Sequence, residues 1–363
     1  MQFIRLITTL SVFTASLLSA DTSVLIAGKG GLYRTSLNHE SGQLSNPELI
    51  HKYGSGSWLV HHPSLPIIYS SWHEGKLNGL KALRVDSSRG ITEFSTLEIP
   101  LPAPAHVAVN PTGSLLATAH WGGEATTLVS LNDDGSFAKL EQVFKHEGSG
   151  PRPVQTQARP HFAGFTPDGA HLHVTDLGAD EIWTYSIDHS KARLALAHKT
   201  GLPSGSGPRH LAFSPDQKFA YVSDELSHHV SAFEYDEQNA SFATIQHINA
   251  APAGMEELTN NVSEVLVHPS GRFVYTANRG NDSLAALARD QKTGLLTLVE
   301  IEPARGVWPR NFNITSDGKW MIAASQISGT VAVFSIDQES GKLTYSRNII
   351  NVPAPVRVLL PKE

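Results

Sequence analysis

The sequence predicts an all-β protein, a seven-bladed β-propeller, on three observations. A unit of strand, turn and strand recurs along most of the 363 residues, no long stretch has helical periodicity, and the two ends of the chain supply complementary parts of one further unit. The turns of successive units lie roughly 45–55 residues apart, at the upper end of the periods of propeller blades. Such sheets pack radially around a channel, which protects their edges.

Each copy has the strand content of one blade. A short apolar stretch ends in a turn, a β-rich run such as 273–277 follows, and an apolar strand such as 331–336 comes later. Six complete copies align by their turns, at 57–63, 105–111, 161–167, 209–215, 263–269 and 310–316.

The seventh blade is predicted to combine both ends of the chain. Residues 356–360 form an innermost strand with no partner after it, whereas 24–27 and 32–37 are strands with no innermost strand before them. Joining these segments closes the ring. We therefore expect one propeller domain over 21–363.

Residues 1–20 resemble a secretory signal peptide. Arg5 precedes an uncharged apolar run over 6–18, and small residues follow at Ser19 and Ala20. The run is too short for a typical membrane span, so we expect an exported protein, periplasmic or secreted, with no span in the mature chain. The alternatives are an apolar N-terminal strand or an uncleaved anchor.

Composition narrows the function classes. The formal net charge of −6 argues against a nucleic-acid partner, and the lack of cysteine rules out disulfides and thiol chemistry. The sequence leaves the oligomeric state open.

Because the copies align, the residues at one equivalent position can be compared among them. The first such position lies six residues before each turn. Small residues there suit a crowded channel entrance, so long polar side chains in three copies indicate a function. The occupants are Ser57, Ala105, His161, Arg209, Ser263 and Arg310.

A second set of positions, just past the second strand, is predicted to lie on the same rim, because antiparallel strands joined by a tight turn have adjacent outer ends. Arg209 and Glu225 should therefore meet. A rim of arginines and histidines around one carboxylate suits an anionic small molecule; the alternative is that these charges only satisfy one another in a polar channel. The occupants are His73, Trp121, Leu177, Glu225, Arg279 and Gln326.

At these residues the chain resembles the seven-bladed propeller lactonases, which include bacterial propeller-type 6-phosphogluconolactonases and fungal 3-carboxy-cis,cis-muconate lactonizing enzymes. The resemblance covers essentially 23–361, through the motifs at 159–161, 167–169, 176–180, 207–210, 224–226, 278–280 and 309–312. It implies that His161, Arg209, Glu225 and Arg279 are the catalytic residues. We expect the substrate to contact Arg310, His73, Gln326, Trp121 and His210.

Two positions depart from the family pattern. Arg159 stands where many bacterial members carry a second histidine, and Trp121 stands where a tyrosine is common. Both changes bear on substrate choice.

The residue types suit hydrolysis of a small sugar-type lactone, including one like 6-phosphogluconolactone, by metal-independent acid/base catalysis. Glu225 is the expected base, and His161 is the alternative base or the acid. Arg209 and Arg279 would bind the substrate's anionic group and stabilise the oxyanion. The alternatives are a lactonizing cycloisomerase and an exported propeller that only binds an anion or a protein. A Glu225 that is exposed, or fully neutralised by a bidentate arginine, would favour binding alone.

No metal or other cofactor is expected. The histidine pairs at 61–62 and 228–229 would place adjacent side chains on opposite faces of a strand. His171 and His173 share a face, but no third ligand is evident. The glycines at 28–31 precede a strand rather than the helix that nucleotide-binding loops open.

Overall fold

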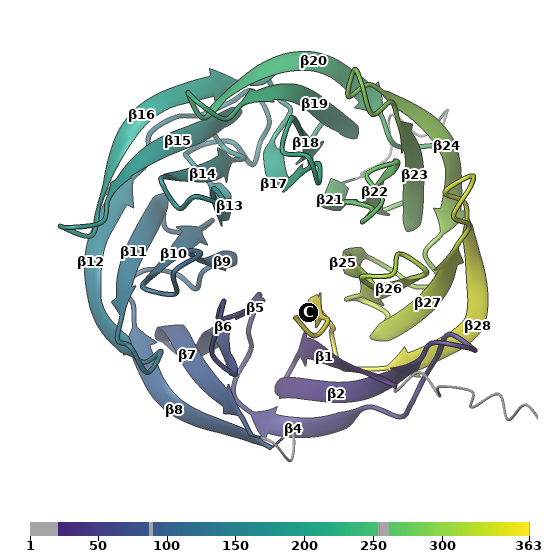
Figure 1. Cartoon of the computed structure of the whole chain (residues 1–363), viewed down its shortest axis with the longest axis horizontal. Helices are drawn as coiled ribbons and strands as arrows, with labels where there is room; N and C mark the ends of the chain where they lie inside the picture. The colour runs from purple at the N-terminus through teal and green to yellow at the C-terminus, as the bar shows by residue number, and fades with distance from the viewer. Residues whose placement is uncertain (1–20, 87–89, 253, 255–260, 363) are drawn as a thin grey trace, which may run out of the picture.

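The computed structural model describes residues 21–86, 90–252, 254 and 261–362, and Figure 1 shows its seven sheets arranged around a central axis. Every regular element among these residues is a β-strand. Neighbouring strands within each sheet pair antiparallel, from an inner strand beside the axis to an outer strand at the perimeter. The prediction of an all-β, seven-bladed propeller is confirmed.

Six blades, numbered here in chain order as blades 2–7, are built from four consecutive strands each. Blades 2–4 contain β5 (Leu59–His61), β6 (Ile67–Glu74), β7 (Leu77–Val85), β8 (Ile91–Glu98); β9 (His106–Val109), β10 (Leu115–His120), β11 (Ala125–Leu131), β12 (Phe137–Lys145); and β13 (Pro160–Phe165), β14 (His171–Asp176), β15 (Glu181–Asp188), β16 (Arg193–Gly201). Blades 5–7 contain β17 (Pro208–Phe213), β18 (Phe219–Asp224), β19 (His229–Asp236), β20 (Ser241–Asn249); β21 (Asn261–Val267), β22 (Phe273–Arg279), β23 (Ser283–Arg289), β24 (Leu296–Pro303); and β25 (Pro309–Ile314), β26 (Trp320–Ser325), β27 (Thr330–Ile336), β28 (Leu343–Asn351).

Blade 1 joins the two ends of the chain. Its inner strand is β29 (Arg357–Leu359), which pairs with β1 (Thr22–Gly28) in a register that places Val358 opposite Ile26. Strand β2 (Gly31–Asn38) follows, and the outer positions are taken by β3 (Gln43–Leu44) and β4 (Glu48–Lys52). In Figure 1 the purple β1 lies beside the yellow C-terminal segment. The predicted closure is therefore present.

The hydrophobic core is divided among the blade interfaces. Seven clusters of buried side chains occur among the described residues, one between each pair of adjacent sheets. Between blades 6 and 7, for example, Tyr275 packs in one cluster with Phe312 and Phe334, all 0% exposed. Since each face of a sheet packs against a neighbouring sheet, the strands inside a blade are apolar on both sides.

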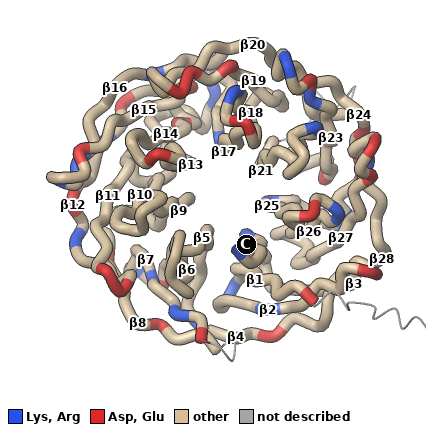
Figure 2. Tube along the Cα trace, in the orientation of Figure 1, with Lys and Arg blue, Asp and Glu red and all other residues tan. Residues whose placement is uncertain are grey.

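Charges of both signs are interspersed around the ring, with no large region of one sign (Figure 2). No helix in the described part of the chain has the length and apolar character needed to cross a membrane. The predicted export signal, 1–20, lies outside the described residues.

Candidate active site

The inner strands of blades 4–7 each carry a β-bulge close to their first residue, whereas those of blades 2 and 3 pair without a register shift. A bulge leaves residues out of the ladder and re-aims their side chains, and bulges occur often beside active sites. The residues skipped by the pairing are His161 in blade 4, Arg209 and His210 in blade 5, Ser263 and Glu264 in blade 6, and Arg310 in blade 7.

Glu225 meets arginines from two adjacent blades. Its Oε2 lies 2.9 Å from Nε of Arg209 and 2.8 Å from Nη2 of Arg279. The contact with Arg209 is close but not aligned as a hydrogen bond, so Coulombic attraction dominates it. The meeting of Arg209 and Glu225 predicted from the hairpin geometry is present.

Burial and charge act in opposite directions on these groups. Burial alone would raise the pKa of Glu225, but the Arg279 and Arg209 guanidinium groups outweigh it and hold that pKa below its usual value. Burial and the like charge of Arg279 lower the pKa of Arg209 to about 9. At neutral pH the cluster therefore contains an ionised carboxylate between two charged guanidinium groups. Glu225 is 16% exposed, so it is not a surface residue.

Arg310 adds a third guanidinium beside this pair. It is half-buried, and burial together with Arg279 lowers its pKa to about 10, which leaves it charged at neutral pH. Unlike Arg209 and Arg279, it has no carboxylate partner among the described residues. Because no carboxylate neutralises it directly, Arg310 can bind an external anion.

His161 is 6% exposed, and its Nδ1 has no hydrogen-bond partner in the described structure. Burial lowers its pKa well below the usual value, and the positive charges of Arg209 and Arg310 act in the same direction. The imidazole is therefore neutral near pH 7, so it acts as an acid only after it has gained a proton.

Trp308, which the sequence analysis did not select, packs against the cluster. The Cζ atom of Arg279 lies 5.1 Å from the centre of its indole ring. Its φ of 67° is strained for a bulky residue. Its backbone N–H donates to Oδ1 of Asp282, and its backbone carbonyl accepts from the N–H of Gln326, so both ends of the residue are held in place. Nothing in the repeat comparison marks this residue, because the strain arises from contacts between blades 6 and 7.

Three predicted substrate contacts have no direct polar contact with Glu225. None of the hydrogen bonds and ion pairs between described residues connects His73, Trp121 or Gln326 with it. His73 is exposed on β6. Trp121 is 36% exposed and stacks with Arg159, whose Cζ lies 4.0 Å from the ring centre. The two departures from the family pattern are therefore in contact with each other.

A layer of mostly buried side chains, which we call the inner ring, lies one residue further along the chain in each blade. Contacts connect its members around the axis: Trp58 and His106 have ring centres 4.0 Å apart, and Arg357 closes the circle, with Nη1 3.8 Å from Glu264 and Cζ 3.9 Å from the centre of the Trp58 ring. In the alignment of the repeats these side chains stand one residue after the positions compared above, so the same alignment could have identified the inner ring. Its members are Trp58, His106, Phe162, His210, Glu264, Asn311 and Arg357.

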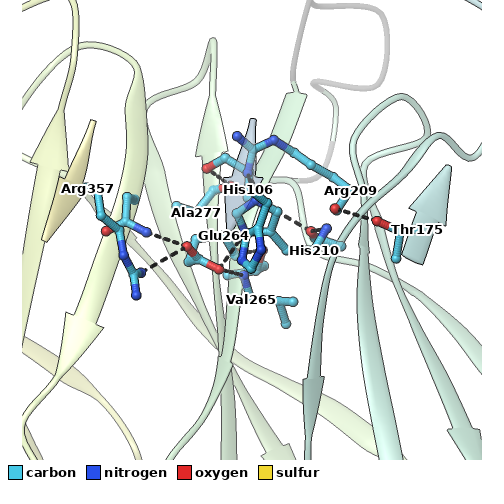
Figure 3. Close-up of polar contacts among 12 residues, drawn as sticks. His106, Thr175, Arg209, His210, Glu264, Val265, Ala277 and Arg357 are labelled. Carbon is cyan, nitrogen blue, oxygen red and sulfur yellow. Dashed lines mark hydrogen bonds and ion pairs between the residues drawn. The ribbon is translucent and has the colours of Figure 1, made fainter. Parts of the chain in front are cut away.

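Glu264 is the acidic centre of the inner ring, as Figure 3 shows. Its Oε1 lies 2.7 Å from Nδ1 of His210, and its Oε2 accepts a hydrogen bond from Asn311 and lies 3.8 Å from Nη1 of Arg357. His210, expected to contact substrate, is only 2% exposed, and both of its ring nitrogens have partners within the protein.

The described residues contain no group of three histidine or acidic side chains placed to hold a metal. A cavity of about 380 Å³ between blades 1 and 2 is mostly apolar, with Leu25, Ile50 and Ile68 in its wall. It lies away from the Glu225 cluster, where the convergent charged groups are, so we place the candidate site at that cluster.

Comparisons with known proteins agree with the fold. The family described as lactonase, 7-bladed beta-propeller, matches residues 17–360. The chain is 33% identical over 334 residues to the 6-phosphogluconolactonase of Bacillus subtilis (strain 168), which covers 91% of this chain and 94% of that protein. Among solved structures, it resembles the periplasmic gluconolactonase of Pseudomonas aeruginosa, with a TM-score of 0.89, 26% identity and coverage of 94% and 99% of the two chains. A putative 6-phosphogluconolactonase from Bacteroides fragilis has a TM-score of 0.86, 27% identity and coverage of 96% and 99%.

Proposed function

Because the chain belongs to the lactonase family of seven-bladed β-propellers, we propose that it hydrolyses a small sugar-type lactone at the cluster of Glu225, Arg209 and Arg279. The family match and the named relatives show that the chain is a lactonase. The substrate class and the mechanism are what we propose. The observation that carries them is the ionised Glu225 carboxylate, held between arginines of two adjacent blades.

In the proposed mechanism, Glu225 accepts a proton from water as the water oxygen bonds to the carbonyl carbon of the lactone. The negative charge that develops on the carbonyl oxygen is stabilised by Arg209 and Arg279. The ring C–O bond then breaks, and the ring oxygen takes the proton, directly or through the neutral His161. The product is a hydroxy acid, which releases one proton when it ionises.

The site and the predicted export signal together favour an unphosphorylated lactone that carries a carboxylate. Arg310 offers a charge to an anionic group on the substrate. Export, indicated by residues 1–20, argues against phosphorylated sugars, which are intermediates of cytoplasmic metabolism. The similarity to a protein described as a periplasmic gluconolactonase supports the same location.

The test is proton release by the purified protein with neutral, carboxylate-bearing and phosphorylated sugar lactones and with 3-carboxymuconolactone, with and without a chelator. We expect the fastest hydrolysis with a carboxylate-bearing sugar lactone and no effect of the chelator. Loss of activity with the chelator would contradict the metal-independent mechanism. Preferred use of 3-carboxymuconolactone would support the lactonizing alternative, and no turnover of any lactone would support a protein that only binds anions.

Arg310→Gln is expected to raise KM for an anionic lactone by about 10- to 100-fold, the value of one or two charge-assisted hydrogen bonds. The change in kcat should be smaller, because a contact to a non-reacting group stabilises the ground state and the transition state alike. Steady-state kinetics test this, with Arg305→Gln as the control, since Arg305 lies in the loop between β24 and β25 and pairs with Glu302 on β24, the outer strand of blade 6. An unchanged KM in Arg310→Gln would remove Arg310 from the site.

A further inference from the structure

His210 contacts both the inner ring and a residue of the candidate site. Its Nδ1 lies 2.7 Å from Oε1 of Glu264, and its Nε2 lies 3.1 Å from Nη1 of Arg209 (Figure 3). The three side chains come from the bulged starts of β17 and β21 and are at most 3% exposed. The position of Arg209 therefore depends on His210 and Glu264, because none of these three side chains can turn toward water without losing a partner.

The hydrogen-bond chemistry permits one tautomer of His210. A guanidinium group has donors and no acceptor, so Nε2 of His210 must accept the hydrogen bond from Arg209. The ring proton therefore resides on Nδ1, where it is donated to the Glu264 carboxylate. Burial lowers the pKa of His210 to about 4, which agrees with a neutral ring at neutral pH.

The same contacts decide which donors Arg209 presents to the site. Its Nη1 has two hydrogens, and both have acceptors, Ser263 O at 2.9 Å and His210 Nε2 at 3.1 Å. The Nε faces Glu225. Among the described residues Nη2 donates no hydrogen bond, so this group remains for a substrate oxygen.

Glu264 is itself held in place on its other side. Burial would raise its pKa, but the hydrogen bond from His210 and the nearby Arg357 guanidinium hold that pKa below its usual value. Asn311 donates to its second oxygen and at the same time accepts a hydrogen bond from the backbone N–H of Val358 in the ring-closing strand β29. The position of Glu264 therefore depends on the closure of the propeller.

We propose that Glu264 and His210 are positioning residues, which fix the guanidinium of Arg209 so that Nε faces Glu225 and Nη2 faces the substrate. The role in catalysis rests on the proposed function. The arrangement itself does not, because the tautomer of His210 can be observed without any substrate.

The first experiment is a long-range ¹H–¹⁵N spectrum of the full chain with ¹⁵N-labelled histidine, near neutral pH, with His210 assigned from the signals lost in His210→Gln. We expect Nδ1 to be protonated and Nε2 to be unprotonated. A proton on Nε2 would overturn the proposal whether or not any lactone is hydrolysed, because Nε2 could then not accept from Arg209.

The second experiment compares the kinetics of His210→Phe, His210→Gln and His106→Phe on the best substrate of the wild type. His106 is the matched control, because its ring is buried in the same inner ring and makes no hydrogen bond to Arg209. His210→Phe should lower kcat/KM by about 10- to 100-fold, as expected when a catalytic group is misplaced. His210→Gln should recover part of the loss, since its amide oxygen can accept from Arg209.

Equal losses in His210→Phe and His106→Phe would overturn the positioning role and indicate a packing effect alone. If His210→Phe does not fold, the comparison of His210→Gln with His106→Phe and the tautomer of the wild type still decide the question. A wild type that hydrolyses no lactone would reject the proposed function, while the spectrum would still decide the arrangement around Arg209.

Discussion

Glu225→Gln is expected to reduce kcat/KM for the lactone by about 100- to 10,000-fold, the usual contribution of a positioned general base. The amide keeps the size of the side chain but cannot accept a proton from water. The loss should appear in kcat, because the base acts only in the transition state. Proton release under saturating substrate measures this directly.

The same variant separates catalysis from anion binding. Removing the negative charge leaves Arg209 and Arg279 without their shared counterion, so the affinity for the hydroxy-acid product, measured by calorimetry, should be retained or increase. A parallel fall in turnover and product affinity would instead mean that Glu225 organises a binding site.

The unpaired arginines should also reduce the stability of Glu225→Gln, so thermal unfolding must accompany the kinetics. Glu93→Gln is the control, because Glu93 forms an ion pair with Lys81 at 2.7 Å on outer strands of blade 2. It should leave kcat/KM at the wild-type value. Full activity in a folded Glu225→Gln would transfer the role of base to His161.

The folded protein is expected to lose several kcal/mol of stability between about pH 6.5 and pH 4, because it buries several neutral histidines. Burial lowers the pKa of His120 and His210 to about 4 and that of His173 to about 3. It also lowers the pKa of His106 and His161 well below the usual value. Each pKa unit by which the folded protein lowers a histidine corresponds to about 1.4 kcal/mol of stability.

Acid lowers the stability because the unfolded chain binds more protons than the folded protein. Below the usual histidine pKa the unfolded chain takes up protons that the folded protein does not, so acid favours unfolding until the folded pKa is reached. Asp224 opposes this trend, because burial raises its pKa well above its usual value. The carboxylates whose pKa values are lowered, such as Glu225 and Glu264, contribute to the loss only at lower pH.

Urea unfolding at a series of pH values measures the free energy of unfolding. The slope of this free energy against pH gives the number of protons that the chain takes up when it unfolds. His173→Gln, which removes one of these groups, should reduce the proton uptake by about one. A free energy of unfolding that stays constant between pH 6.5 and 4.5 would show that the buried imidazoles are protonated or hydrated in the folded protein.

The repeat was sufficient to predict the fold, because each blade is a local antiparallel unit whose strands follow one another in the chain. It also predicted the meeting of Arg209 with Glu225, since both lie within one hairpin. The contact between Glu225 and Arg279 joins equivalent positions of neighbouring blades, so the alignment of the repeats predicted it as well. Neither Trp308 nor Glu264 was predicted from the sequence, and His210 was predicted to contact the substrate although its ring lies in the inner ring.

The sequence alone determined the seven blades, the closure of the ring by its two ends and the identity of the arginines around Glu225, because period-2 strands and tight turns act over short distances along the chain. Only the tertiary structure decided which side chains of different blades share the inner ring and which way each one faces. The β-bulges at the starts of the inner strands shift side chains by one position, and the packing of blades far apart in sequence sets their neighbours. For that reason only the folded structure shows that Arg209 faces the candidate site whereas its neighbour His210 lies in the inner ring.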